Sequence, residues 1–517
     1  MLVFGILVGV LVTLISYLLL LMRRRLNYWH SRQVACEPPH LLLGNFRGMR
    51  TKYSFPEIWM NYYKKFKGSG PFAGFFWFSH PAVFVLDLEL IKNILTKDFA
   101  KFMDRGFFHN EEDDPLTGHL FFLDGLKWKS LRQKLTPTFS SGKIAKMFPM
   151  VKDLTGRLVD TMEKKLKESQ ESGKEEWRNV LELKDLLARF GTDVIGCCAF
   201  GIDCNSLSNP EAKFHIMGKR LLSEPRNGQL GNALAFNFPD LVKKFHMKII
   251  PDEISEFFMD LVKTTIKTRE ENPTEREDFL AMLMELREGN QIKTEDGEES
   301  KSLTLEEIAA QIVLFFLAGY ETFSTTVGFA LYELARHQEI QNRLRQEIME
   351  VWEKYEKDFT YESIKEMSYL QQVIQETLRL YIPVPVLNRK CLEDLEDPVP
   401  GHDEKYLIKK GMNVLIPVLA IQRDEEFFPQ PDDFNPENFS PSNCKGRESV
   451  VYMPFGEGPR NCIGKRFGEM QTALVLATLV KNFKFSTCPQ TQIPIVFNKE
   501  TYFLGAAHGI YLRVERI

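Results

Sequence analysis

The N-terminal end of this chain carries no charged side chain from Met1 to Met22, and three arginines, Arg23 to Arg25, follow at once. At about 1.5 Å per helical residue this stretch reaches about 33 Å, enough to cross the hydrocarbon core of a bilayer. The bulky run from Leu18 to Leu21 offers no small-residue cleavage site, so we expect an uncleaved signal anchor. The alternative is an apolar helix buried in a protein core, although the stretch shows no amphipathic pattern.

The arginine triplet also predicts an orientation. By the positive-inside rule it stays cytoplasmic, which places the rest of the chain in the cytosol, and we expect the endoplasmic reticulum membrane to hold the anchor. Pro38, Pro39, Gly44 and Asn45 predict a stiff, turn-rich hinge. We therefore expect an anchor over 1–22, a basic stop and Pro-rich hinge over 23–45, and one large body over 46–517.

Composition limits what this body can be. Apolar residues make up 44% and charged residues 26%, which excludes wholesale disorder. The 70 acidic side chains slightly exceed the 66 basic ones, so no basic field exists to hold nucleic acid. The eight cysteines have no regular spacing and do not form a disulfide framework, which favours a reducing, cytosol-facing environment.

The periodicity of the body predicts a mainly α fold with a small β part, an α+β architecture. Helical patterns dominate, with examples at 131–135, 180–190, 303–336 and 369–380. Strand-like alternation is confined mainly to 82–87, 412–417 and 493–514. A polar loop over 287–302 is expected to be a solvated connection between two helical runs.

One cysteine lies in a loop that suits a metal ligand. The loop, Phe455-Gly-Glu-Gly-Pro-Arg-Asn-Cys-Ile-Gly464, is turn-rich and leads into an expected apolar helix. Amide groups at a helix entrance favour thiolate over thiol, and thiolate is the form that binds metals. Gly458 and Gly464 lack a Cβ, so a large flat cofactor could approach the backbone, and Arg460 could pair with an anionic group. Taken alone, Cys462 could also be a small buried hydrophobe.

An acid and a hydroxyl interrupt another apolar helical run, in Ala318-Gly-Tyr-Glu-Thr322. A threonine can bond a carbonyl one turn back and glycine weakens a helix, so the pair permits a local bulge that admits water or dioxygen. The alternative is that the glycine only eases close helix packing.

Two weaker pairs lie at helical spacing. Glu376 and Arg379 share one helix face, where an exposed pair contributes only about 0.3 to 0.5 kcal/mol. Trp128 and Arg132 lie one turn apart, and by spacing alone they could be a surface cation over an aromatic ring.

Taken together, these motifs resemble those of the haem-thiolate monooxygenases, the cytochrome P-450 superfamily, in the family's order along nearly the whole chain. The cysteine loop has the pattern of the family's haem-binding loop, F-x-x-G-x-R-x-C-x-G. The resemblance implies a cytochrome P-450 fold, with 46–517 as the catalytic domain. Asp104-Arg-Gly106, Asp113-Asp-Pro-Leu116 and Leu135-Thr-Pro-Thr-Phe139 look most like the insect microsomal branch of family-six detoxifying enzymes.

The resemblance implies roles for particular residues. Cys462 would be the axial ligand of the iron of haem b, with Phe455 packed beside the sulfur. Propionate partners would be Trp128, Arg132, Arg389 and Arg460. Glu321 and Thr322 would guide protons to bound oxygen.

It also implies a buried structural lock, which Glu376 and Arg379 would form. The family's third member is an arginine in P-E-R-F, whereas this chain reads Pro436-Glu-Asn-Phe439. Asn438 can donate hydrogen bonds but supplies no charge, which puts the charge balance of the lock in question.

The activity implied is insertion of one oxygen atom from O2 into a small apolar substrate, by hydroxylation or epoxidation. Electrons would come from NADPH through the diflavin NADPH-cytochrome P-450 reductase, with cytochrome b5 as a further candidate partner. Xenobiotics, insecticides and endogenous lipids or hormones are the expected substrate classes. Substrate-contacting segments of the family correspond to Phe107, Phe108, Phe121, Phe122, Phe315, Ala318, Val384, Val386 and Phe503.

Two other functions compete with this one. A haem-thiolate isomerase or dehydratase rearranges a peroxide without dioxygen or reductase, and Glu321 with Thr322 argues against it. A non-catalytic haem carrier or sensor needs neither the pocket residues nor that pair.

Overall fold

The computed structural model describes residues 2–171, 173, 175–224, 226–273, 276–287, 302–396 and 406–517. Most of the polar loop expected over 287–302 therefore lies outside the described residues. The chain forms two compact units that interleave along the sequence. Unit 1 comprises Met1–Gly106, Pro385–Ile421 and Ser449–Asn461, and unit 2 comprises Phe107–Val384, Gln422–Glu448 and Cys462–Ile517.

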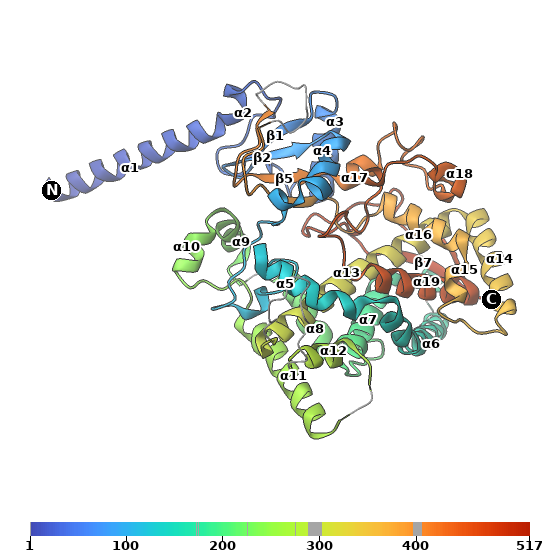
Figure 1. Cartoon of the computed structure of the whole chain (residues 1–517). Coiled ribbons are helices and arrows are strands. Elements are labelled where there is room, and N and C mark those ends of the chain that lie inside the picture. The colour runs from blue at the N-terminus through green and yellow to red at the C-terminus, as the bar shows by residue number, and fades with distance from the viewer. Residues whose placement is uncertain are drawn as a thin grey trace. The chain divides into compact units, whose positions relative to one another are not determined.

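Unit 1 is built on a four-stranded sheet with the order β1-β2-β5-β4 (Figure 1). The antiparallel pair β1 (Phe72–Trp77) and β2 (His80–Val85) is rich in aromatic and β-branched residues, which suit a pleated, buried surface. Strand β5 (Asn413–Ile416) lies parallel to β2 and antiparallel to β4 (Leu387–Lys390). Two strands that are distant in sequence from β1 and β2 thus belong to the same sheet, and β4 fixes the backbone of Arg389.

Two tryptophans anchor the helices of unit 1 to this sheet. Trp29 and Trp59 are fully buried, and the ring centroid of Trp59 lies 5.4 Å from that of Phe75 in β1. A Cβ on Gly74 would come within 2.3 Å of the Trp29 ring, so only glycine allows this close approach. The other elements of unit 1 are α1 (Leu2–Leu26), α2 (Tyr28–Ser31), α3 (Phe55–Phe66), α4 (Leu88–Lys92), the π-helix η1 (Asn93–Lys97), the 3-10 turns η2 (Phe99–Phe102) and η9 (Ser449–Val451), and α17 (Val418–Gln422).

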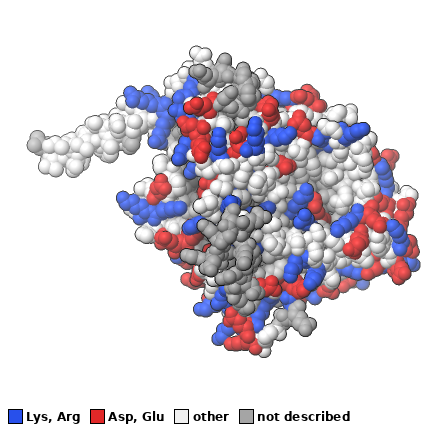
Figure 2. All heavy atoms as spheres, viewed as in Figure 1, with Lys and Arg blue, Asp and Glu red and all other residues white. Residues whose placement is uncertain are grey.

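Helix α1 is the expected N-terminal apolar segment, and it continues through the arginine triplet to Leu26. Figure 1 shows it as a straight rod that carries the N-terminus, and Figure 2 shows its surface free of charge until the arginines. Among the described residues two helices are long and apolar enough to cross a membrane, Val3–Leu26 and Leu305–Arg336. None of the first is buried, whereas 67% of the second is, so the second is mostly a core helix of unit 2 and the first is open to its surroundings.

Unit 2 is mainly helical, as the periodicity predicts. Its helices are α5 (Gly125–Leu135), α6 (Ser141–Glu171), α7 (Leu183–Ile195), α8 (Lys213–Ser223), α9 (Gly228–Asn237), α10 (Pro239–Lys244), α11 (Asp252–Glu271), α12 (Phe279–Arg287), α13 (Leu305–Arg336), α14 (Gln338–Lys354), α15 (Ser363–Glu366), α16 (Ser368–Leu380), α18 (Pro441–Cys444) and α19 (Lys465–Asn482). The shorter turns are η3 (Pro115–Thr117), η4 (Thr136–Phe139), η5 (Glu175–Trp177), the π-helix η6 (Gly196–Phe200) and η8 (Pro436–Phe439).

Helix α13 is the core of unit 2 and packs against α7, α16 and α19, among others. It begins with a capping box in which Thr304 and Glu307 satisfy each other's backbone amides. Its apolar residues surround the helix rather than forming one stripe, which is the pattern of a helix buried on all sides. Polar residues in the middle of such a helix, such as Glu321 and Thr322, are therefore candidates for a functional role.

A second sheet, in the order β3-β7-β6, corrects two details of the sequence prediction. β3 (Val180–Glu182) begins the stretch expected to be helical, because it pairs with β7 (Tyr511–Arg516), and Glu182 then caps α7. The expected strand over 493–514 is mostly irregular, with β7 at its end. β7 also pairs with β6 (Phe483–Ser486), a strand that the sequence patterns did not reveal.

Candidate active site

The predicted cysteine loop passes from unit 1 to unit 2 between Asn461 and Cys462. As expected, a helix follows it: α19 begins at Lys465 with Gly464 as its N-cap residue. Cys462 is exposed, unlike the other cysteines of unit 2 except Cys444. The loop therefore presents a thiol next to the positive end of a long helix, the environment that stabilises a thiolate.

Within unit 2, the W-x-x-x-R helix lies close to this cysteine. Trp128 and Arg132 are on α5, where Trp128 is buried and Arg132 half-buried. Burial lowers the pKa of the Arg132 guanidinium, and the charge of the nearby Cys462 thiolate partly offsets this. A cation and the candidate ligand are thus neighbours within one unit, although Arg132 precedes the loop by most of the chain.

Within unit 1, two buried arginines are the predicted partners of an anion. The Arg460 guanidinium is buried, with Nε donating to the carbonyl of Met103 at 2.8 Å and Nη2 at 4.0 Å from an Asp104 carboxylate oxygen. Arg389 on β4 is 1% exposed, and its Nε has no hydrogen-bond partner among the described residues. Burial lowers the pKa of Arg389 to about 10.

The Nε of Arg389, which has no hydrogen-bond partner among the described residues, shows whether the residues present fit a haem. A buried guanidinium without a counter-charge is costly, so the open Nε of Arg389 is a site for an anionic oxygen. A haem propionate supplies such an oxygen, and a thiolate supplies the iron ligand. Each unit therefore has groups that suit a haem: Arg389 in unit 1 suits an anionic side chain, and Cys462 beside Arg132 in unit 2 suits the iron and a second anionic group.

The two glycines of the loop have different surroundings. Gly458 has a φ of +73°, and a Cβ there would lie 1.8 Å from the carbonyl oxygen of Leu95. Close backbone packing within unit 1 thus already requires this glycine, whatever approaches it from outside. A Cβ on Gly464 would only touch the Phe139 ring, at 3.8 Å, so its role beside a cofactor stays a prediction.

Glu376 and Arg379 on α16 form a buried pair, and both are fully inaccessible to solvent. Arg379 binds the carboxylate with two hydrogen bonds, Nε to Oε2 at 2.7 Å and Nη2 to Oε1 at 2.8 Å. Its other N–H groups donate to the carbonyls of Gln422, Pro431 and Asp433. All five guanidinium donors are used, which explains why arginine is needed here.

Asn438 takes part in this lock by hydrogen bonding alone. Its side-chain amide donates to Glu376 Oε1 at 3.1 Å, and the backbone amide of Asn435 donates to the same oxygen at 2.8 Å. One carboxylate and one guanidinium already balance, so no further cation is needed. Arg447 lies over the Phe439 ring and donates to the Asn438 carbonyl, which holds the asparagine from the other side.

The acid and hydroxyl of α13 lie on a continuous helix, without the local bulge that their pattern permits. The Thr322 hydroxyl donates to the Ala318 carbonyl one turn back. A Cβ on Gly319 would come within 2.4 Å of Ile195 on α7, so this glycine allows close helix packing, the simpler of the two interpretations. Glu321 pairs with Lys184 of α7, Nζ to Oε1 at 3.0 Å.

The predicted pocket residues fall into different surroundings. Phe107, Phe121 and Phe122 form a group of rings with centroids 5.6 to 5.9 Å apart. Phe108 packs instead into a small core with residues of α9 and α10, and Phe315 packs against the rings of Phe139 and Phe279. Ala318 in unit 2 is exposed, whereas Val384 and Phe503 in unit 2 and Val386 in unit 1 are half-buried. All nine stay predictions as substrate contacts.

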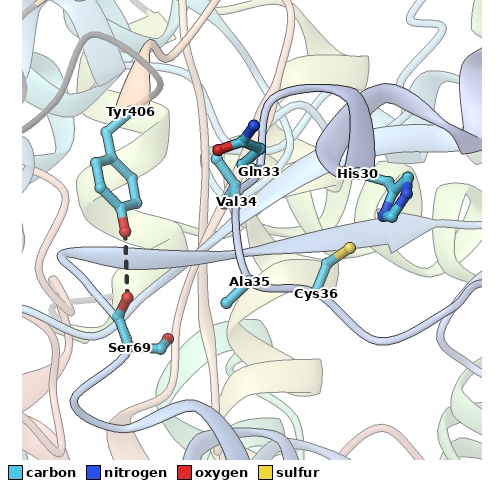
Figure 3. Close-up of a pocket in the computed structure, with 7 residues that line it drawn as sticks. All are labelled: His30, Gln33, Val34, Ala35, Cys36, Ser69 and Tyr406. Carbon is cyan, nitrogen blue, oxygen red and sulfur yellow. Dashed lines mark hydrogen bonds between the residues drawn. The ribbon is translucent and has the colours of Figure 1, made fainter.

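A pocket of about 440 Å³ lies elsewhere, within unit 1. Its lining comes from His30 in α2, from the segment after α2, including Cys36, and from Ser69 and Tyr406 (Figure 3). The Tyr406 hydroxyl donates to the Ser69 carbonyl. None of the predicted site residues lines it, so it is separate from the chemistry of the cysteine loop.

The structure adds functional candidates that sequence patterns did not show. Lys184 reaches Glu321 from another helix, and no local motif marks it. The carbonyls that complete the Arg379 lock carry no side-chain identity, so only tertiary structure could reveal them.

Comparison with known proteins agrees with this geometry. The family model of cytochrome P450 matches residues 34–514. The chain is 52% identical over 515 residues to Cytochrome P450 6a9 of Drosophila melanogaster, covering 100% of both chains. It is 44% identical over 510 residues to Cytochrome P450 6A1 of Musca domestica, covering 98% of this chain and 97% of that relative. The exposed thiol at the entrance of α19 and the near-complete family match lead to one conclusion: the chain belongs to the cytochrome P450 family of haem-containing monooxygenases.

Proposed function

We propose that this P450 is anchored by α1 in the endoplasmic reticulum membrane and oxidises small apolar substrates in the cytosol. Electrons come from NADPH through the diflavin reductase, and cytochrome b5 is a second possible donor. Substrates are xenobiotics such as insecticides, and endogenous lipids or hormones. The observation that carries the proposal is the thiol of Cys462 at the start of α19, beside the Arg132 cation.

Cys462 would hold the haem iron, and Arg132, Trp128, Arg389 and Arg460 would hold its propionates. When bound, haem supplies activation of dioxygen at an iron made electron-rich by the thiolate. The lock between Glu376 and Arg379 ties α16 to the segment after Gln422 through buried hydrogen bonds. It thereby fixes the part of unit 2 that precedes the loop.

Helix α13 carries the two side chains that would deliver protons, Thr322 and Glu321. The Thr322 hydroxyl donates to Ala318, so its oxygen lone pairs remain acceptors for water. Lys184 pairs with the carboxylate of Glu321, the residue that precedes Thr322. In apolar surroundings a placed hydroxyl, ordered water and a nearby carboxylate are the groups able to carry protons.

The proposal is tested with a panel of apolar compounds incubated with full-length protein, reductase and NADPH. A monooxygenase yields a product heavier by one oxygen atom, and that oxygen comes from labelled O2. An isomerase or dehydratase would consume a peroxide substrate without NADPH. A haem carrier or sensor would yield no product from any compound.

Replacing Thr322 by alanine is expected to uncouple the enzyme while leaving haem binding intact. NADPH oxidation continues, but product per NADPH falls about threefold or more and hydrogen peroxide rises. The reason is that the hydroxyl contributes to proton delivery, and a positioned proton-transfer group typically contributes about 10²- to 10⁴-fold. Thr326→Ala is the matched control, since its hydroxyl bonds the Thr322 carbonyl one turn further along. Equal coupling in wild type and Thr322→Ala would disprove the proton route.

The membrane topology predicts what protease can reach. In sealed microsomes, added protease should digest the body and leave a short fragment containing α1, because the arginine triplet keeps everything after it in the cytosol. A lumenal marker protein controls for sealing. Protection of the whole chain would mean the opposite orientation.

Five cations of unit 2, all exposed except the half-buried Lys134, are expected to steer the acidic reductase. They lie on α5 and at the start of α19: Lys127, Lys129, Lys134, Lys465 and Arg466. Lys127 and Lys465 also pair locally, with Glu111 at 2.9 Å and Glu469 at 3.9 Å, so part of this charge is neutralised. A merely solvated face is the competing interpretation.

Charge reversal distinguishes a surface that steers the reductase from a merely solvated face. Lys465→Glu with Arg466→Glu should slow electron transfer from reductase severalfold at low salt and flatten its salt dependence, since steering is screened by ions. Lys164→Glu on α6, at a side chain 79% exposed, is the control for a charge change elsewhere. An unchanged rate at low salt would favour the solvated face.

A further inference from the structure

Three cysteines that are not part of the haem loop lie close together in unit 2. Cys197 and Cys198 are on the π-helix η6, and Cys204 follows it; all three are free thiols. A Cβ on Gly196 would come within 2.2 Å of Cys204 Sγ, so the third thiol packs against the start of this turn. Cys198 is fully buried, whereas Cys197 is partly exposed.

An arginine is directed at the Cys197 sulfur. Arg276 Nη2 lies 2.9 Å from Cys197 Sγ and 3.0 Å from the Cys197 carbonyl oxygen. A guanidinium is always charged and donates to thiolate far better than to thiol. The contact therefore favours the ionised, nucleophilic form of this cysteine.

The charged groups around Arg276 carry one more positive charge than negative charge. Asp278 is fully buried and accepts from Arg269 on α11 through two hydrogen bonds, and Arg276 Nε lies 3.1 Å from the same carboxylate. Two guanidiniums thus share one carboxylate, and a Cys197 thiolate would make the group neutral. The other carboxylate acting on Cys197, Asp203, is paired with Arg157 at 2.9 Å.

Glycine at the end of η6 makes this arrangement possible. Gly201 has a φ of +69°, and a Cβ there would lie 1.7 Å from Arg269 Nη2. Because Gly201 adopts a left-handed conformation and has no Cβ, the Arg269 guanidinium can pack against the backbone at the end of the turn. A π-helix at a cluster of reactive groups is a common feature of functional sites.

We propose that Cys197 is a peroxide-reactive site, where the thiolate held by Arg276 is oxidised reversibly to a sulfenic acid. The sulfur attacks one oxygen of hydrogen peroxide, so an S–O bond forms and the O–O bond breaks. Sulfur loses two electrons, and the departing hydroxide takes a proton to become water. Cys198 cannot close a disulfide with its chain neighbour inside a helical turn, so the sulfenic acid remains open to small thiols.

The pKa shifts of the three thiols support the assignment of Cys197 as the reactive one. The hydrogen bond from Cys198, together with Arg276, lowers the pKa of Cys197 to about 7 against the cost of burial. Burial raises the pKa of Cys204, and the pKa of Cys198 is also raised, chiefly by its hydrogen bond to Cys197. Near neutral pH, Cys197 is thus the ionised member of the group.

Alkylation of the full-length, haem-loaded protein tests the proposal, with each cysteine followed by peptide mass spectrometry. Cys197 should react with iodoacetamide faster than the more exposed Cys444 at pH 7, and its rate should level off above about pH 7. After hydrogen peroxide, dimedone should label Cys197 before the other cysteines. Slower alkylation than Cys444 together with no dimedone adduct at Cys197 would overturn the proposal.

Substitution of the arginine tests the cause. Arg276→Gln should slow Cys197 alkylation at pH 7 severalfold, because loss of the guanidinium raises the pKa and leaves fewer thiolates, while the hydrogen bond from Cys198 remains. Arg276→Lys should restore part of the rate, and Arg287→Gln, which removes an exposed ion pair with Glu270, should leave it unchanged. An unaltered rate in Arg276→Gln protein with an intact haem spectrum would refute the role of the guanidinium.

Discussion

Replacement of Cys462 by alanine should reduce product formation at least about a hundredfold, equivalent to about 2.7 kcal/mol of lost transition-state stabilisation. The reason is that no other cysteine of the chain lies in the loop that enters α19. Without a thiolate ligand, the electron density that assists cleavage of dioxygen is lost. The measurement is product per enzyme with reductase and NADPH at saturating substrate.

Cys444→Ala is the matched control, because Cys444 is the other exposed cysteine of the described residues and lies outside the loop. It should retain full activity. Circular dichroism of Cys462→Ala should show the helical fold, so that loss of activity is not loss of structure. An alanine variant that keeps more than a tenth of wild-type turnover would exclude Cys462 as the iron ligand.

Replacement of Arg379 by alanine should destabilise the fold by about 3 to 5 kcal/mol, the usual consequence of leaving a buried charge without its partner. Glu376 would remain fully buried, and the carbonyls of Gln422, Pro431 and Asp433 would lose their donor. We expect little folded, haem-containing protein. Haem content per polypeptide and thermal unfolding of the purified protein measure this.

Arg379→Lys should recover little, because an ammonium cannot bind both carboxylate oxygens and three carbonyls at once. Arg343→Ala is the control: its ion pair with Glu437 is shorter, at 2.5 Å, but exposed, so its loss should cost less than about 1 kcal/mol. Similar losses in the Arg379 and Arg343 variants would show that burial does not make this lock special.

Residues that interact over a few positions could be predicted from the sequence. The start of α19 at Lys465, the long α13 and the pairing of Glu376 with Arg379 all follow from helical spacing and from the turn residues of the loop. The N-terminal helix follows from composition alone, since an uncharged stretch of this length has few other environments.

Interactions between distant segments could not be predicted in the same way. β4 is a four-residue strand without a clear alternation, and it exists because β5 pairs with it. The partner of Glu321 lies on another helix, and the reason for Gly458 is the Leu95 carbonyl, far away in sequence. The question of charge balance at Asn438 needed the hydrogen bonds of Glu376, which only the folded chain shows.

The carbon monoxide spectrum of the reduced, full-length protein tests the central claim most directly, because the position of its Soret band reports the ligand opposite carbon monoxide. We predict the red-shifted band typical of thiolate ligation in the wild type and in Cys444→Ala, and its loss in Cys462→Ala. A wild-type band at the position of histidine-ligated haem, or an unchanged band in Cys462→Ala, would contradict the assignment of Cys462 as the iron ligand.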